Sequence, residues 1–485
     1  MTGSVAVPLW LLVALVAFAL FAALEWLLLP GVRWYFRRKV RRVMDEIGTR
    51  FSIELPEFKL TRRRALIDRL TSDPRVLATV HRHAAESGTP RDVLLQRVDV
   101  YAREIVPAFN AYAYFRIGYW LAKTFARMAY RVRLGSSDAA ALAAVAPSST
   151  VVFVMNHRSN MDYVLVSFLA AERVALSYAV GEWARIWPLQ SLIRAMGAYF
   201  VRRNSGDPLY RMVLQRYVQM ATEGGVPQAM YPEGGLTNDG RLRAPKLGLL
   251  DYMLKGFDPK GERDLVFIPV GINYDRVLED RSLLRKLDPA APKVGLATTA
   301  TTAARFAGRQ LALAVLGRRY RPGYACVNFG APVSMRAWVG ERGVDLRALD
   351  DDARRPAVAA VGAAQIGRIV PVLPVPLVAS VLLREPDRPL AELELKAEVQ
   401  ALMARVEAGG AHVYVPRADR DYALAVGLRM LTLRELVLER EEGLFVANPD
   451  ELPLLCYYAN SIAHLTEPAA RSLPDQSNTG PAAPS

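Results

Sequence analysis

A histidine and an aspartate five residues apart, His157 and Asp162, are the residue types in this chain best suited to acid–base chemistry. They follow an apolar run at 150–155 and stand before or within a segment with helical character at 161–171. On one continuous helix, five residues rotate a side chain by about 140°, so the pair can meet only across a turn. Ser159 can cap the helix with Asp162 at its third position, and this geometry makes a hydrogen bond between the two side chains feasible.

Such a pair would act as a general base. A carboxylate that holds one imidazole nitrogen sets the tautomer and raises the basicity of the other nitrogen. That second nitrogen could take a proton from an alcohol that attacks a carbonyl carbon. The alternative is that Asp162 is only a helix cap and His157 an ordinary loop residue, and the spacing alone does not choose between them.

Two arginines end the segment 197–203, Gly-Ala-Tyr-Phe-Val-Arg-Arg, directly after a short expected strand at 199–201. The guanidinium groups of Arg202 and Arg203 match phosphate oxygens in a two-point geometry. The alternative is a solvated arginine pair without a ligand. The segment therefore indicates a phosphate contact only in combination with other motifs.

A glycine pair follows another expected strand, 227–231, in the sequence Tyr-Pro-Glu-Gly-Gly that ends at Gly235. Glycines let backbone N–H groups approach a ligand closely, where they could act as oxyanion donors. Pro269 lies inside the apolar run 265–274, and its missing N–H predicts an edge strand or a bulge there.

Apolar runs alternate with amphipathic segments from about residue 148, which predicts an α/β fold with a central mixed sheet flanked by helices. The expected strands are 150–155, 199–201, 227–231, 265–274 and 324–329, and the expected helices are 161–171 and 209–223. Residues 111–132 predict an amphipathic helix, packed on the core or lying on a membrane. The run 371–383 is too short and too broken by prolines to span a bilayer, so we expect it to be core or interfacial.

The N-terminus carries an apolar run at residues 7–24, long enough to cross a bilayer core of about 30 Å. Glu25 interrupts it, and six Lys and Arg residues follow between 33 and 42. The positive-inside rule then predicts a single-pass anchor in the cytoplasmic membrane, with the catalytic part in the cytoplasm. The alternative is a helix buried inside the fold.

The sequence predicts five regions in this 485-residue chain: a transmembrane anchor at 1–31, a helical N-terminal region at 32–147, an α/β domain at 148–340, a mostly helical C-terminal region at 341–465 and a disordered tail at 466–485. The net charge of +14 suits an anionic partner. The aromatic residues follow helix faces and form no stacking platform, so we expect no nucleic-acid binding. The two cysteines, Cys326 and Cys456, form no metal-type pair, and no metal site is predicted.

Together these motifs resemble the glycerolipid acyltransferase superfamily, and most nearly the bacterial-type glycerol-3-phosphate 1-O-acyltransferases. The His-x4-Asp box is similar at 157–162, and three further boxes follow in the family's order at 197–203, 233–235 and 266–270. A weaker similarity covers 457–464. The resemblance implies the acyltransferase assignment of the α/β domain at 148–340.

The resemblance implies transfer of a fatty acyl group from acyl-CoA or acyl carrier protein to a glycerol phosphate hydroxyl, without an acyl-enzyme and without a cofactor. It makes His157 the general base and Asp162 its partner. The partners implied are the acyl carrier, glycerol 3-phosphate or a lysolipid, and an anionic membrane. The implied substrate contacts are Arg158, Ser159, Gly197, Arg202, Arg203, Glu233, Gly234, Gly235, Arg241, Lys246 and Pro269.

One departure concerns the acceptor. The family's third box continues with arginines, whereas this chain has Leu236 and Asn238 at two of those positions and keeps Arg241. A lost charge-assisted contact would cost about 1.5–3 kcal/mol. Arg243 or Lys246 could replace it, or the acceptor could be lysophosphatidic acid, another lysolipid or an alcohol without phosphate. A non-catalytic lipid-binding protein is the remaining hypothesis, and the intact His157–Asp162 pair argues against it.

Overall fold

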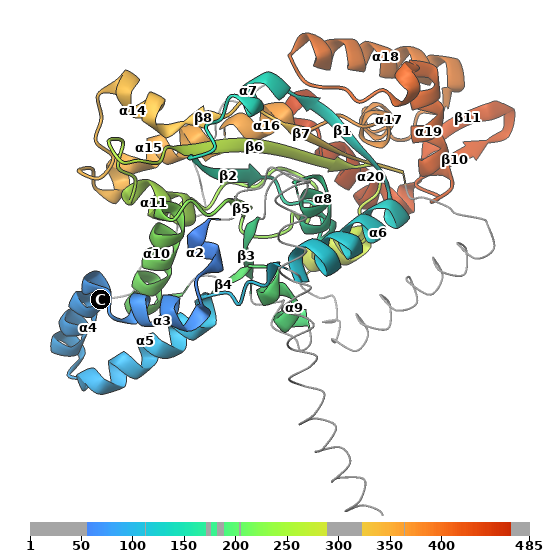
Figure 1. Ribbon diagram of the computed structural model, residues 1–485. Helices are drawn as coiled ribbons and strands as arrows, with labels where there is room; N and C mark the ends of the chain where they lie inside the picture. The colour runs from blue at the N-terminus through green and yellow to red at the C-terminus, as the bar shows by residue number, and fades with distance from the viewer. Residues whose placement is uncertain are drawn as a thin grey trace, which may run out of the picture.

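The computed structural model describes residues 56–111, 113–170, 176–181, 189–202, 205–288, 323–362 and 364–466 (Figure 1). The expected anchor at 1–31 and the expected tail from 467 onward lie outside the described residues. Within the described residues, no helix combines the length and the apolar character that a membrane crossing requires.

The main sheet is mixed, which confirms the predicted α/β class. Its strand order is β1-β7-β6-β2-β5-β3-β4, with β8 beside β6. Neighbouring strands run parallel except where β6 meets β7 and β8. The strands are β1 (Arg131–Ser137), β2 (Thr150–Met155), β3 (Ser177–Gly181), β4 (Tyr199–Val201), β5 (Gln228–Met230), β6 (Leu265–Tyr274), β7 (Tyr324–Phe329) and β8 (Val333–Ser334).

Five neighbouring strands, β6, β2, β5, β3 and β4, point the same way. We call the side of the sheet where these five strands end the carboxyl edge, and the side where they begin the amino edge. Parallel strands of this kind are buried on both faces and carry nearly continuous apolar sequence. In β6 all ten residues are buried, and in β2 five of six are.

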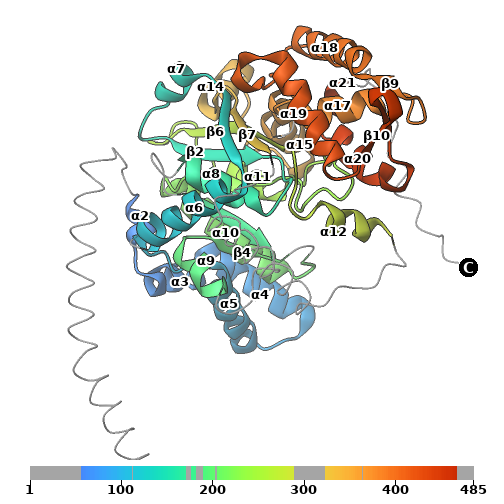
Figure 2. The ribbon, with the colours of Figure 1, turned by 90° about the vertical axis from the view of Figure 1, so that its right-hand side faces the viewer.

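Alternate residues of β2 enter two different cores, because successive side chains of a strand point to opposite faces. Phe153 and Met155 pack with α8 (Met161–Ala170) and the C-terminal helices. Val152 and Val154 pack with α10 (Pro208–Glu223) and the N-terminal helices. Figure 2 shows these two groups of helices on opposite sides of the sheet.

The N-terminal helices pack mainly against α10, and Asp207 caps α10 by accepting from the N–H groups of Leu209 and Tyr210. The segment expected as one helix at 111–132 is a π-helical turn, Ala113–Gly118, followed by α6 (Tyr119–Ala129). The end of that prediction is wrong, since β1 begins at Arg131. The helices of this half and of the sheet connections are α2 (Glu57–Leu60), α3 (Arg63–Thr71), α4 (Pro74–Ser87), α5 (Arg91–Ile105), α7 (Ala139–Ala143), α9 (Leu189–Ala195), α11 (Gly248–Lys255) and α12 (Asp280–Leu284).

The C-terminal region is mostly helical, and it adds a three-stranded antiparallel sheet that the sequence analysis missed. Helix α17 (Pro374–Leu382) belongs to the core, since eight of its nine residues are buried. The remaining elements are α14 (Met335–Arg342), α15 (Asp351–Gly362), α16 (Ala364–Ile369), α18 (Glu392–Ala408), α19 (Arg420–Thr432), α20 (Leu452–Asn460), α21 (Ala463–Thr466), β9 (Leu390–Ala391), β10 (Val437–Arg440) and β11 (Leu444–Ala447).

The prediction of an edge strand or bulge at Pro269 is wrong. Strand β6 lies inside the sheet, and its parallel pairing with β2 runs regularly through Val154 and Pro269. On the other side, β8 pairs only up to Phe267 and β7 only from Val270 onward. The carbonyl of Pro269 accepts from Gly330 N–H at 2.9 Å, at the break between these two partner strands. A proline is tolerated there because the continuous ladder is interrupted at its position.

Candidate active site

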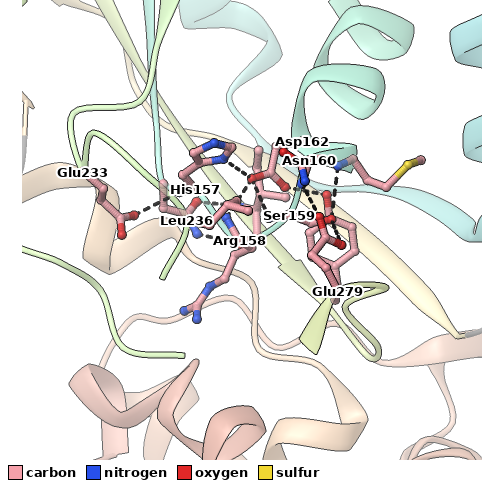
Figure 3. Close-up of polar contacts among 12 residues, drawn as sticks. His157, Arg158, Ser159, Asn160, Asp162, Glu233, Leu236 and Glu279 are labelled. Atoms are coloured by element: carbon pink, nitrogen blue, oxygen red, sulfur yellow. Dashed lines mark hydrogen bonds and ion pairs between the residues drawn. The ribbon is translucent and has the colours of Figure 1, made fainter. Parts of the chain in front are cut away.

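The His157 and Asp162 side chains meet at the carboxyl edge, directly after β2 (Figure 3). Nδ1 of His157 lies 2.9 Å from Oδ2 of Asp162. Both residues are buried, with 4% of His157 and none of Asp162 exposed. A carboxylate accepts only, so the imidazole N–H sits on Nδ1 and the lone pair on Nε2. Among the described residues, Nε2 has no hydrogen-bond partner, so it is available to a substrate.

Three more hydrogen bonds fix the Asp162 carboxylate. Its Oδ2 accepts the backbone N–H groups of Arg158 at 2.7 Å and Ser159 at 3.0 Å. Its Oδ1 accepts the Tyr274 hydroxyl from the end of β6 at 2.5 Å. Asp162 is thus both the predicted cap at the start of α8 and the partner of His157, because the turn from 157 to 161 folds back over the carboxylate.

Glu233 holds the histidine from the other side. Its Oε1 accepts the backbone N–H of His157 at 2.9 Å and its Oε2 that of Arg243 at 3.2 Å. Burial raises the pKa of Glu233. The His157 ring stacks on Tyr231, with ring centroids 4.1 Å apart. The motif at 231–235 therefore positions the histidine through a carboxylate and an aromatic ring.

Glu279 is a residue of this site that the sequence analysis missed. Its carboxylate accepts the Ser159 hydroxyl at 2.9 Å and the Asn160 N–H at 2.7 Å, so it anchors the middle of the His157–Asp162 turn. Burial raises the pKa of Glu279. The only available signal was its place five residues beyond the expected strand at 265–274, on the same sheet edge as His157.

Two family models match the chain. Residues 139–273 match the Acyltransferase family, and residues 311–471 match the Glycerol-3-phosphate acyltransferase C-terminal region. The chain is therefore similar to acyltransferases in two separate regions. The first model covers β2, the His157–Asp162 turn and most of β6, and the second covers α14 to α21.

Curated relatives named "Glycerol-3-phosphate acyltransferase" are similar along most of the chain. That of Xanthomonas campestris pv. campestris is 26% identical over 463 residues, which are 88% of this chain and 48% of the relative. That of Pseudomonas putida is 28% identical over 342 residues, 66% of this chain and 39% of the relative. The chain spans about half the length of the curated relatives it matches.

Among solved structures, the chain is similar to the 1-acyl-sn-glycerophosphate (LPA) acyltransferase PlsC from Thermotoga maritima. The identity is 18%, the TM-score is 0.29, and the match covers 60% of this chain and 99% of that one. A likeness of this size supports no inference about function.

Arg158 points away from His157 toward the C-terminal helices (Figure 3). Only 2% of it is exposed. Its guanidinium donates to the backbone carbonyls of Gly240 and, at 2.8 Å, of Ser461, while its Nε has no partner among the described residues. In this structure Arg158 therefore joins the His157 turn to the 233–241 loop and to the end of α20.

The glycines of the third motif shape the loop beneath His157. Gly234 has φ +67°, and an added Cβ would come within 2.9 Å of Cδ of Lys246. Gly235 is buried beside it, whereas Arg241 and Lys246 are exposed. Leu236 packs its half-buried side chain against the apolar core.

The second motif is divided between the two edges of the sheet. Gly197 precedes β4 at the amino edge, away from His157. Arg202 follows β4 at the carboxyl edge, but β4 lies three strands from β2, a separation of about 14 Å. Arg202 pairs with Glu104 through two hydrogen bonds of 2.9 and 2.6 Å. Arg203 lies outside the described residues.

Proposed function

We propose that this acyltransferase moves a fatty acyl group from acyl-CoA or acyl carrier protein to the sn-1 hydroxyl of glycerol 3-phosphate. The observation that carries the proposal is the buried His157, whose Nδ1 is held by Asp162 and whose Nε2 keeps its lone pair. The two family models and the names of the curated relatives support the substrate class.

In the proposed reaction, Nε2 of His157 takes the proton of the acceptor hydroxyl as its oxygen attacks the thioester carbonyl carbon. The tetrahedral intermediate then collapses, the C–S bond breaks, and the leaving thiolate takes the proton back from Nε2. Asp162 stabilises the imidazolium that exists between these two steps. His157 takes up one proton and returns it within the same reaction, so the proposed mechanism uses no metal or cofactor.

The third motif, at 233–241, bears on which acceptor the enzyme uses. Leu236 places an apolar, half-buried side chain beside the His157 loop where a phosphate-binding arginine is expected. This observation favours lysophosphatidic acid, or another lysolipid, as the second candidate acceptor. The exposed cations Arg241, Arg243 and Lys246 on the same loop would meet a phosphate in either case.

We further propose that residues 7–24 anchor the enzyme in the cytoplasmic membrane, with the described part on the cytoplasmic side. The apolar run and the basic cluster after it support this orientation. Deleting residues 1–31 should shift the protein from the membrane fraction to the supernatant after sedimentation. If the shortened chain stays fully in the membrane fraction, another part of the protein is the anchor.

The decisive experiment is an acceptor panel on the full chain, with labelled acyl-CoA or acyl carrier protein and either glycerol 3-phosphate or lysophosphatidic acid. The His157→Ala variant should lose acyl transfer to every acceptor. The matched control is His81→Ala, which removes an exposed imidazole on α4. Retained turnover in His157→Ala, with an unchanged circular dichroism spectrum, would exclude the general-base mechanism.

A further inference from the structure

A cavity of about 280 Å³ opens at the amino edge of the main sheet. The end of α2, the start of α3, the loop at 107–110 and the beginnings of β3 and β4 surround it. His157 follows the opposite end of the parallel strand β2, so the sheet separates this cavity from the catalytic pair. The residues that give the cavity its chemistry are Lys59, Thr61, Arg62, Arg63, Ser177 and Gly197.

The cavity carries a concentration of positive charge. Three cations, Lys59, Arg62 and Arg63, line it, and none of its described lining residues is Asp or Glu. Arg63 donates from Nε to the Val106 carbonyl at 3.0 Å and from a terminal nitrogen to the Arg103 carbonyl. Burial and the nearby Arg103 guanidinium lower the pKa of Arg63.

The Lys59 amine lies deep in this wall. Only 7% of the residue is exposed, and its Nζ sits 4.6 Å from the Phe109 ring centroid and 5.6 Å from that of Tyr114. Burial lowers the pKa of Lys59 to about 7. An anion in the cavity would favour the charged form of this amine, so binding and protonation should be coupled.

Two further features prepare the cavity for a polar ligand. Ser177 is a mostly buried residue at the start of β3, and it lines the cavity. Gly197, at φ +87°, brings its backbone so close to the wall that an added Cβ would lie 3.0 Å from Phe109 and 3.3 Å from Cε of Lys59.

We propose that this cavity is a second anion site, which binds a phosphomonoester group apart from the catalytic centre. Its volume lies just below the range of roughly 300–1,000 Å³ typical of sites for drug-sized ligands, so it suits a phosphate on a small organic group. The same chemistry has two sources, a free metabolite or the headgroup of a phosphatidate lipid. This inference does not depend on the identity of the acyl acceptor.

The test is protection of Lys59 from an amine-modifying reagent, measured by mass spectrometry on the full chain. Inorganic phosphate should slow labelling of Lys59 at least five-fold in the native protein. One further arm replaces phosphate with vesicles of phosphatidylcholine containing phosphatidic acid, and another uses phosphatidylcholine alone. Protection by the phosphatidic acid vesicles assigns the site to a lipid headgroup, and protection by phosphate alone assigns it to a soluble metabolite.

The variant Arg62→Gln removes an exposed cation from the cavity rim and should abolish most of the protection. The matched control is Arg64→Gln, two residues further on, which is exposed on α3 and does not line the cavity. Equal protection in the native protein and both variants would overturn the proposal, as would the absence of protection by phosphate and by phosphatidic acid. Acyl transfer by the Arg62→Gln variant reports separately on the catalytic site.

Discussion

At the carboxyl edge of the main sheet, buried carboxylates hold the turn that carries His157 and Asp162. Asp162 accepts four hydrogen bonds, and Glu233 and Glu279 each accept two. At the amino edge, Lys59 and two arginines surround a cavity that has no carboxylate among its described lining residues. Carboxylates therefore dominate the contacts at the first edge, whereas cations dominate the lining of the cavity at the second.

This difference between the two edges suits two tasks, general-base catalysis at the carboxyl edge and anion binding at the amino edge. A catalytic base must keep one geometry and one tautomer, so its partners are internal and fully bonded before a substrate arrives. A binding site for an anion gains affinity when its positive charges have no competing carboxylate close by. Four changes test this contrast between the two edges, and their expected effects decrease from the first to the last.

The largest effect should come from Asp162→Asn. The amide would donate a hydrogen bond to Nδ1 of His157 and move the ring proton to Nε2, which removes the base. We expect kcat to fall by roughly 10²–10⁴-fold with little change in KM. Steady-state kinetics on the full chain measures this, and a kcat within ten-fold of the native value would show that Asp162 is only a helix cap.

Asp275, which follows β6 at the carboxyl edge, should make stability fall as pH rises. It is buried and accepts N–H groups from Tyr324 at 2.9 Å and Val375 at 3.2 Å, and burial raises its pKa to about 6. The folded state therefore holds a proton that the unfolded state loses near pH 4. The contribution is fully present below pH 4 and decreases by up to about 3 kcal/mol as pH rises through 6.

Urea unfolding midpoints at pH 4, 5.5 and 7 test this linkage. In the Asp275→Asn variant the midpoint should change less between pH 4 and 7 than in the native chain, because the isosteric amide does not titrate. Identical pH dependence in both proteins would show that Asp275 ionises at its ordinary pKa and that the cost of burying this carboxylate is compensated.

At the amino edge, anion affinity should fall as pH rises. Burial lowers the pKa of Lys59 to about 7, whereas burial raises the pKa of its neighbours Tyr114 and Tyr217. The Lys59 amine therefore loses its charge between pH 6 and 8.5. Binding of inorganic sulfate, whose own charge is constant in this range, should weaken several-fold and by no more than about 30-fold.

Calorimetric titration with sulfate at pH 6 and pH 8.5 measures this effect. The Lys59→Met variant keeps an apolar side chain of similar length and should bind weakly at both pH values. An affinity that is independent of pH in the native chain would mean that Lys59 does not contact the bound anion.

The smallest effect should come from Tyr274→Phe. It removes one of the four hydrogen bonds to the Asp162 carboxylate and leaves the other three, so kcat should fall about three- to ten-fold. The matched control is Tyr178→Phe, whose hydroxyl bonds to Ser167 and not to Asp162. Equal kcat values for the two variants would show that the Tyr274 bond does not orient the carboxylate.

Much of the sheet was predictable from local apolar patterns. The runs at 150–155, 199–201, 265–274 and 324–329 coincide with β2, β4, β6 and β7. Strand β1 was missed because its exposed residues, Arg131 to Ser137, show no continuous apolar run. The small sheet of β9 to β11 was missed because its strands are only two to four residues long, too short for a periodic signal.

The contact between His157 and Asp162 was predictable for a physical reason. The 157–162 turn is local, so one strand end and one helix start suffice to bring the two side chains together. The partners of that turn come from distant segments, and no local pattern indicates that the Glu279 carboxylate or the Tyr274 hydroxyl reaches it. Spacing likewise could not reveal that Arg158 is bound by the carbonyls of Gly240 and Ser461.

The sequence by itself determined the strand and helix periodicity, the His157–Asp162 turn and the excess of positive charge, because these depend on neighbours along the chain. Only the tertiary structure decided which edge of the sheet each motif occupies. Gly197 and Arg202 are five residues apart, yet strand β4 between them carries one to the amino edge and the other to the carboxyl edge. The direction of a strand depends on its pairing with other strands, and that pairing is not written in any single segment.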